Sequence, residues 1–169
     1  MLGKLFCGIM YPSLELCQKA IDELTKQYGE IEVESEAYDF SFTDYYQEEF
    51  GIGLKKKFVV FRNPIEREAL SDIKLFTCGL EKKLGRGAKR TVNIDPGYIT
   101  PNNVVVASTK EFPSRIYLGK GIYGDLQLIL KRAEAVPMPF TFADYKLNKA
   151  FFHKIRPSCA KIGKWANMA

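Results

Sequence analysis

The chain has 169 residues, 46% of them hydrophobic and 13% aromatic, which excludes a disordered chain and predicts one domain over 1–169. Its net charge of +5 is unevenly divided, since residues 1–50 hold eleven acids and three lysines and residues 51–169 hold nine acids and 22 basic residues. Such a split can mean an anion-binding face in the later part, or two parts that fold together and neutralise each other.

Hydrophobic periodicity predicts a βαββαβ order over about residues 3–100. The expected elements are a strand at 4–10, a helix from its N-cap Ser13 to a stop at Gly29, an extended segment at 31–42 broken near Ala37, a strand at 54–63, a helix capped by Asn63 with Pro64 in its first turn and ended by Gly85, and a strand at 89–95. This order indicates an α+β, ferredoxin-like fold with two helices on one face of an antiparallel sheet. A doubly wound parallel sheet is the alternative, but no third βαβ unit follows.

Residues 101–169 are expected to extend this core with a β-hairpin and a C-terminal helical segment. The expected parts are a strand or short helix at 103–109, a hairpin at 115–132 that turns at Gly119–Gly121, a loop at 133–145, and a helical segment from about Asp144 to Trp165, interrupted at Pro157. The basic tail at 146–169 is interleaved with aromatic residues, which suits either RNA binding or a helix that docks on the sheet.

Several kinds of site are excluded. The four cysteines are widely spaced and His153 is the only histidine, so a structural zinc site is excluded, and we expect Cys7, Cys17 and Cys78 to pack in the core. The sequence has no phosphate-binding GxxxxGK[ST] loop, and no GxGxxG follows a strand. The apolar start of the chain is too short for a membrane span and lacks a signal-peptide cleavage pattern, so we expect a cytoplasmic protein.

The segment VNIDPGYITP, 92–101, combines a turn signal with polar side chains. Pro-Gly favours a type II turn, which predicts a turn over Asp95–Tyr98. Asn93 and Asp95 alternate with apolar residues, so both side chains would point to the same face at the end of a strand. The segment is therefore either a plain turn or one wall of a site, and Tyr98 would then belong to that wall.

The segment ASTKEFPSRIYL, 107–118, concentrates hydroxyl groups and cationic donors. Ser108, Thr109, Lys110 and Arg115 could together hold a phosphate or a carboxylate, because arginine binds such groups through two nitrogens and lysine supplies a point charge. The alternative is a solvated loop with ordinary surface charges.

The segment FTDYYQEEFG, 42–51, places carboxylates among large rings. Asp44 could act as a general base or hold Mg²⁺ through water, together with Asp95. Tyr45 and Tyr46 could stack on a ring or donate hydrogen bonds. The alternative is an exposed acidic loop whose tyrosines cover the core.

Five segments, 42–51, 73–81, 90–100, 105–128 and 140–146, resemble in sequence and order a prokaryotic family of unknown function. Its members often carry the automatic label "GTP-binding protein", and the resemblance covers roughly residues 1–160. The resemblance implies shared motif residues, which are Asp44, Tyr45, Tyr46, Glu49, Lys74, Asn93, Asp95, Gly97, Tyr98, Ser108, Thr109, Lys110, Arg115, Tyr117, Gly121, Tyr123 and Tyr145. Ser114 stands where many relatives have His, so any proton transfer through that position would differ here.

Three functions are compatible with these patterns. The first is a pocket for a small anionic or phosphorylated ligand, such as a nucleotide, with or without Mg²⁺ and catalysis. Its tentative catalytic residues are Asp44 and Asp95, and its ligand-binding residues are Tyr45, Tyr46, Glu49, Asn93, Tyr98, Ser108, Thr109, Lys110, Arg115 and Tyr123. The second is an RNA-binding module that uses the basic later part, and the third is a protein-interaction scaffold. GTP binding stays open, whereas GTP hydrolysis through a P-loop is excluded by the missing motif.

Overall fold

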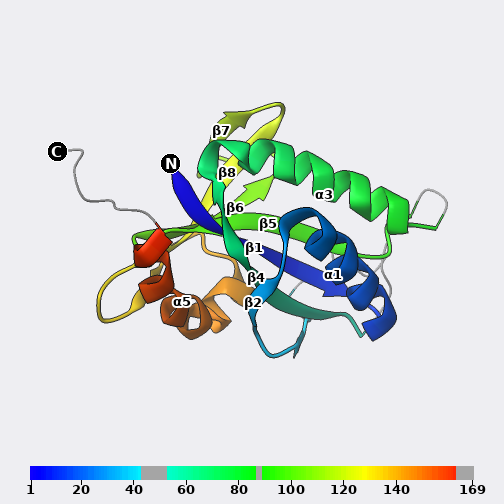
Figure 1. The fold of residues 1–169 in the computed structure, drawn as a ribbon, viewed down its shortest axis with the longest axis horizontal. Helices are drawn as coiled ribbons and strands as arrows, with labels where there is room; N and C mark the ends of the chain where they lie inside the picture. Colours follow the sequence, from blue (N-terminus) through cyan, green and yellow to red (C-terminus); the bar gives the residue numbers. More distant parts are fainter. Residues whose placement is uncertain (43–52, 87–88, 163–169) are drawn as a thin grey trace.

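The computed structural model describes residues 1–42, 53–86 and 89–162, and its centre is one nine-stranded sheet (Figure 1). The strands are β1 (Leu2–Tyr11), β2 (Ile31–Glu34), β3 (Tyr38–Asp39), β4 (Lys55–Glu66), β5 (Asn93–Ile99), β6 (Asn103–Ser108), β7 (Arg115–Gly119), β8 (Ile122–Leu130) and β9 (Ala135–Pro137). The helices are α1 (Leu14–Tyr28), α3 (Leu70–Leu84), α4 (Ala143–Leu147) and α5 (Lys149–Ile162), and a 3₁₀ turn, η2 (Arg67–Ala69), precedes α3. Within the described ranges, no helix has both the length and the apolar character needed to cross a membrane.

The strands follow the order β2-β4-β1-β5-β6-β8-β7, with β3 also paired to β4 and β9 to β8. All of these pairs are antiparallel, so the parallel alternative is wrong. The α+β prediction and the βαββαβ order of the first hundred residues are confirmed, with the two-residue β3 added.

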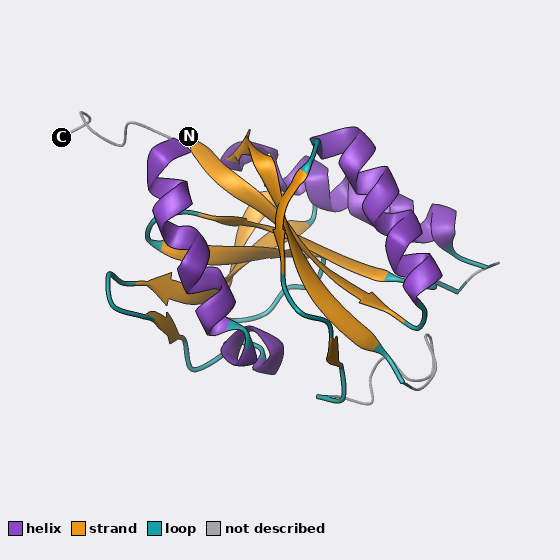
Figure 2. Ribbon diagram, turned by 60° about the horizontal axis from the view of Figure 1, so that its bottom comes forward, coloured by secondary structure: helices purple, strands orange, loops and turns teal. Residues whose placement is uncertain are grey.

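Helices cover both faces of the sheet (Figure 2). Successive side chains of β1 point to opposite faces. Leu5 and Cys7 pack in the cluster that includes buried residues of α1 and α3, while Phe6 packs in the cluster that includes Tyr145 of α4 and Phe152 of α5. Because both faces are covered, β1 is buried from Gly3 to Tyr11, and Lys4 is its one charged residue. The expectation that α1 and α3 share one face is confirmed, and the C-terminal segment docks on the other face.

Local signals place α1 as expected. The Ser13 side chain accepts a hydrogen bond from the backbone N–H of Leu16, at 3.4 Å, and Gly29 ends the helix with a φ of 89°. The hairpin between β7 and β8 also turns where expected, at Gly119 and Gly121, which both have positive φ.

The predicted start of the second helix is wrong. β4 continues through Asn63 and Pro64 to Glu66, and α3 begins only at Leu70. Pro64 lies opposite Lys4 of β1, so pairing with β1 keeps this stretch extended despite its helix-start signals. On the other side of β4, the pairing with β2 ends at Phe61, so a missing N–H at Pro64 breaks no β2–β4 hydrogen bond.

Three further predictions need correction. The Asp95–Tyr98 turn is wrong, because these residues lie inside β5 and pair with β1. The expected loop at 133–145 contains β9 and the start of α4. The helical segment breaks at Asn148 rather than at Pro157, which lies inside α5. Pro157 is on the exposed side of α5, where a carbonyl without its helical donor can bind water.

Candidate functional site

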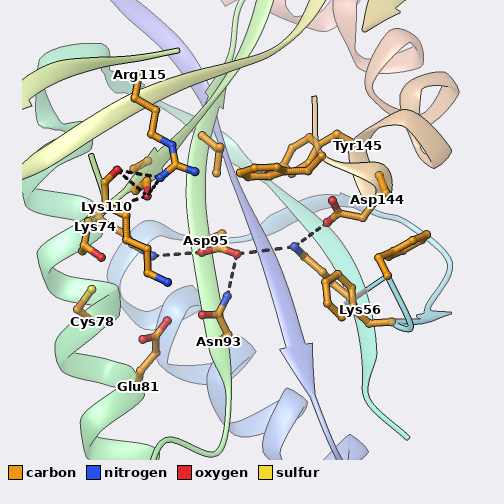
Figure 3. Close-up of a pocket in the computed structure, with 18 of the residues that line it drawn as sticks. Lys56, Lys74, Cys78, Glu81, Asn93, Asp95, Lys110, Arg115, Asp144 and Tyr145 are labelled. Atoms are coloured by element: carbon orange, nitrogen blue, oxygen red, sulfur yellow. Dashed lines mark hydrogen bonds and ion pairs between the residues drawn. The ribbon is translucent and has the colours of Figure 1, made fainter. Parts of the chain in front are cut away.

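A cavity of about 710 Å³ opens where β5 and β6 separate (Figure 3). The two strands pair only from Gly97 to Ile99, where Gly97 lies opposite Val106. Before Gly97, β5 keeps its pairing with β1, but no strand of the described residues pairs with its other side. The first residues of β5 and the last residues of β6 therefore form two walls of the cavity.

Pro96 gives a physical reason for this separation. In an antiparallel pair, the backbone groups of alternate residues point to the same side of the strand. Those of Ile94 point away from β1, because they bond to side chains of α3, so the corresponding groups of Pro96 point the same way. Pro96 has no N–H to donate there, and the ladder with β6 cannot continue past it. The Pro-Gly pair thus ends the pairing of two strands rather than turning the chain.

Two side chains of α3 take the place of the missing strand. The N–H of Ile94 donates to Glu81 Oε1, at 2.6 Å, and its carbonyl accepts from Lys74 Nζ, at 3.0 Å. Both backbone groups of Ile94 are thereby satisfied without β6. Glu81 and Lys74 are almost completely buried, and these hydrogen bonds compensate in part for the loss of water.

Asp95 lies at the centre of a line of charges that crosses the cavity (Figure 3). Its Oδ1 is 3.2 Å from Lys74 Nζ on one side, and its Oδ2 is 3.7 Å from Lys56 Nζ on the other. The amide of Asn93 donates to Oδ2 at 2.7 Å. Lys56 also pairs with Asp144 Oδ2 at 2.7 Å. Charged groups from β4, α3, β5 and α4 are therefore linked within one buried network.

This network determines the protonation of its members. Burial disfavours the charged form of Lys56, but Asp144 and Asp95 outweigh that effect and raise the pKa of Lys56. Lys74 behaves in the same way, because Asp95 and Glu81 raise its pKa against the effect of burial. For Asp95, burial acts to raise the pKa, but Lys74 and Lys56 outweigh it and lower the pKa. Both lysines and Asp95 are thus charged at neutral pH, and Asp95 is a weak base.

Glu81 has the opposite tendency. Burial raises its pKa, and the opposing effects of Lys74 and of the Ile94 N–H do not cancel this rise. Its second oxygen, Oε2, is 3.2 Å from Arg90 Nη1, which also donates to the side chain of Asn93. Because the pKa of Glu81 is raised and that of Asp95 is lowered, Glu81 is better suited than Asp95 to exchange a proton.

The segment that links β6 to β7 also lines the cavity, and hydrogen bonds from Arg115 hold it in place. The Arg115 Nε donates to the buried Asp125 at 2.7 Å, and Nη1 donates to Ser108 Oγ at 2.9 Å and to the Lys110 carbonyl at 2.8 Å. Ser108 Oγ also accepts from the Lys110 N–H at 3.1 Å. Nη2 of Arg115 forms no hydrogen bond with the described residues. A rigidly held guanidinium with a remaining donor group is a suitable anion contact.

The structure brings six of the expected site residues together in the lining of this cavity, namely Asn93, Asp95, Ser108, Thr109, Lys110 and Arg115. Tyr98 is not among the lining residues, because it points to the opposite side of β5 and packs beside Leu70. Tyr123 is also outside the lining and packs against Tyr117 on the hairpin, with their ring centres 5.3 Å apart. The expected site residues Asp44, Tyr45, Tyr46 and Glu49 lie outside the described residues.

Several lining residues were not identified from their sequence pattern, namely Lys56, Cys78, Glu81, Arg90 and Asp144. A signal existed for two of them. Lys56 shares the parity of the buried Phe58 and Val60, an unusual place for a lysine on a strand. Glu81 follows Lys74 by seven residues, so both occupy one side of α3. Cys78 lies between them and lines the cavity, so the expectation that it packs in the core is wrong.

The expectation of Mg²⁺ gains nothing from Asp95. The Asp95 carboxylate already contacts Lys74, Lys56 and Asn93, and a cation would have to replace these donors. Within the described ranges, no group of three His, Cys, Asp or Glu side chains is arranged to hold a metal ion. Asp44 lies outside these ranges, so its part in metal binding stays a prediction.

Comparison with protein families gives a match over most of the chain. No curated protein and no solved structure matches the chain. The profile of one family, described as a domain of unknown function, DUF4416, matches residues 1–158. This span contains the whole of the cavity lining and agrees with the expected resemblance to a family of unknown function. The chain therefore belongs to the DUF4416 family of proteins of unknown function.

Proposed function

We propose that the cavity binds a small anionic ligand whose phosphate or carboxylate group lies against Thr109, Lys110 and Arg115. The composition of the lining carries this proposal. Its three described acids are paired with basic residues of the same lining, Asp95 with Lys74, Asp144 with Lys56, and Glu81 with Arg90. The described lining has five basic residues and three acidic ones, and a fourth acid, Asp125, pairs with Arg115 from outside the lining. Counted with Asp125, these described groups still hold one more basic than acidic residue, which favours an anion.

A phosphorylated metabolite or a nucleotide such as GTP is the finer form of this proposal. The cavity volume of about 710 Å³ lies within the range of roughly 300–1,000 Å³ that is usual for small-molecule sites. A nucleotide would bind here without a P-loop, through side chains at the separation of two strands. Enzymatic turnover, with Glu81 rather than Asp95 exchanging the proton, is compatible with the same geometry.

The fold gives little support to the RNA-binding alternative. A ferredoxin-like RNA-binding domain stacks bases on an open face of its sheet. Here α5 covers that face with Phe152, Ile155 and Cys159, all of them buried. The aromatic residues that could stack on bases from the sheet, Phe6 and Phe58, are therefore inside the core.

We also propose that the first part of the chain is a ferredoxin-like core. The order β2-β4-β1-β5, with α1 and α3 on one face, supports this assignment. The elements from β6 to α5 would then complete a single domain, because α4 and α5 share their apolar cluster with β1 and β4.

The ligand class can be tested by thermal unfolding. Inorganic phosphate, phosphorylated metabolites, ATP and GTP would each be added with and without Mg²⁺. A ligand at 100 times its Kd raises the free energy of unfolding by about 2.7 kcal/mol, which is visible as a higher Tm. We expect a hit whose affinity falls about tenfold in Lys110→Ala, the loss of one charged hydrogen bond.

The matched control is Lys120→Ala, because Lys120 is on the β7–β8 turn, pairs with Asp72 and does not line the cavity. Its affinity for the hit should equal that of the unchanged protein. A stable protein whose Tm responds to none of these anions, or a hit that is equally weakened in both variants, would contradict the proposed function.

A further inference from the structure

One side of the cavity is aromatic and differs from the basic side that holds Lys110 and Arg115. On the side of Lys56 and Asp144, the lining is aromatic (Figure 3). Its rings come from the segment after β3 and from the start of α4, and they are Phe40, Phe42, Phe142 and Tyr145. Basic side chains and a set of aromatic rings thus line the same cavity.

Two of these rings are exposed although they line a concave site. Phe42 is 44% exposed and Phe142 is 40% exposed, whereas Tyr145 is only 1% exposed. The ring of Phe142 contacts Tyr145, with centres 6.1 Å apart, and that of Phe42 contacts Phe40 at 5.5 Å. Both exposed rings are therefore held by buried or half-buried neighbours. Single exposed apolar residues are common, but two on one wall of a cavity are what a ring-bearing ligand would cover.

The aromatic rings begin close to Arg115, which belongs to the proposed anion site. The Arg115 guanidinium carbon lies 5.8 Å from the centre of the Phe142 ring. A ligand that contacts both must carry its anionic group within a short linker of its ring. Inorganic phosphate alone would leave most of a cavity of about 710 Å³ without contacts.

From these three observations we infer that the ligand is an aromatic or heteroaromatic ring joined through a short linker to a phosphate or carboxylate, with the ring packed on Phe142 and Phe42. This inference rests on the proposed function, since it adds the ring to the anion. Stacking provides affinity for the flat part, and Lys110 with Arg115 selects the charged part.

Calorimetric titration of the full chain tests the inference with matched probes. Phenyl phosphate is compared with inorganic phosphate, benzoate with acetate, and nucleoside 5′-monophosphates with ribose 5-phosphate. We expect the ring-bearing member of at least one pair to bind ten or more times more tightly than its ring-free partner. The pairs with this difference also identify the source of the ring and the type of anion.

Two variants and one control test where the ring of the ligand binds. Phe142→Leu and Phe42→Leu remove an exposed ring but keep an apolar side chain, so the fold should be retained, as unfolding curves would verify. We expect them to bring the ring-bearing probe close to the affinity of its ring-free partner, whose own affinity stays unchanged. Phe76→Leu is the matched control, because Phe76 is a similarly exposed ring on α3 that packs on Tyr28 and does not line the cavity.

Two outcomes separate the inference from the proposed function. Equal affinities for ring-bearing and ring-free probes, with binding still weakened by Lys110→Ala, would overturn the ring and leave the anion site intact. If no phosphate or carboxylate binds at all, the proposed function fails and this inference fails with it.

Discussion

Asp95 and Glu81 line the same cavity, yet their surroundings shift their pKa in opposite directions. Both are buried enough for the loss of water to favour the neutral acid. Asp95 contacts two lysines, and their combined attraction lowers its pKa. Glu81 has Arg90 at 3.2 Å, but its burial, together with the negative charge of Asp95, outweighs the nearby positive charges and raises its pKa. At the scale of single residues, position relative to Lys74 and Lys56 decides which carboxyl group is a permanent charge.

The variant Asp95→Asn should destabilise the protein at neutral pH. It leaves Lys74 and Lys56 buried with one fewer negative charge between them. Breaking a buried pair costs about 3–5 kcal/mol, and because the Asp95 side chain is 25% exposed we expect about 2 kcal/mol. Urea unfolding at pH 7 would measure it. The control Asp39→Asn changes an acid that is 83% exposed and should cost less than about 1 kcal/mol.

The difference in stability between the unchanged protein and Asp95→Asn should depend on pH. Because the pKa of Asp95 is lowered by folding, its contribution is complete above the unfolded value, 3.8, and is lost as the pH falls through the folded value. The difference in stability between the unchanged protein and Asp95→Asn should therefore be constant from pH 5 to 7 and shrink below about pH 4. A difference that stays constant down to the lowest pH at which both proteins fold would mean that the network does not lower this pKa.

At the scale of elements, the cavity depends on where β5 stops pairing with β6. Pro96 removes the donor that the ladder would need, and Lys74 and Glu81 of α3 satisfy the open edge of β5 at Ile94. Gly97 then brings β5 close to β6 and β1. A Cβ at Gly97 would lie less than 3 Å from the Val105 carbonyl oxygen and from the ring of Phe6. Pro96 thus ends the pairing of β5 with β6, and Gly97 allows the close approach of the strands where they do pair.

Two glycine-to-alanine variants test the close approach at Gly97. Their expected changes in the free energy of unfolding have opposite signs. Gly97→Ala places a methyl group against backbone and a buried ring, so we expect a loss of about 1–3 kcal/mol. Gly79→Ala lies on α3, where nothing is within 4 Å of the added carbon, and should gain about 0.5–1 kcal/mol from helix propensity. Urea unfolding measures both changes. A neutral Gly97→Ala would show that the strands have room to move apart.

At the scale of the whole molecule, the uneven charge of the chain is resolved by folding. Acids of the first fifty residues pair with basic residues that come later, and these pairs are Glu23–Lys83, Glu30–Arg62, Glu34–Lys57 and Asp39–Lys55. Of the two explanations for the charge split, mutual neutralisation is the one that these ion pairs support. A scaffold function based on two oppositely charged parts therefore loses its main argument.

The docking of α5 is the second feature at this scale, and it supports a prediction. Phe152 is completely buried against Phe6, Phe58 and Tyr145, with ring centres between 4.9 and 5.5 Å from its own. Phe152→Ala should cost about 3–5 kcal/mol because it leaves a cavity in this cluster. Lys154→Ala, an exposed position on the same helix, should change stability by less than about 0.5 kcal/mol. Equal and small effects in thermal unfolding would mean that α5 is dispensable for the fold.

The sequence by itself determined the features that depend on neighbouring residues. Ser13 and Gly29 mark the ends of α1, Gly119 and Gly121 mark the hairpin, and the pattern of strands and helices gives the α+β class. It also selected two segments, around Asp95 and around Lys110, that line one cavity. These signals are readable because capping, positive φ and the two periodicities depend only on local geometry.

Only the tertiary structure decided the rest. Pro64 and Pro96 have turn or helix-start signals, yet pairing with β1 keeps both in strands. Lys56 and Glu81 become site residues because β4 and α3 pack beside β5, which no local pattern encodes. The cavity itself exists because two strands that are joined at Gly97 separate before it. Strand pairing is a long-range interaction, so its free energy can override local preference. The cavity lies where the pairing of β5 with β6 ends.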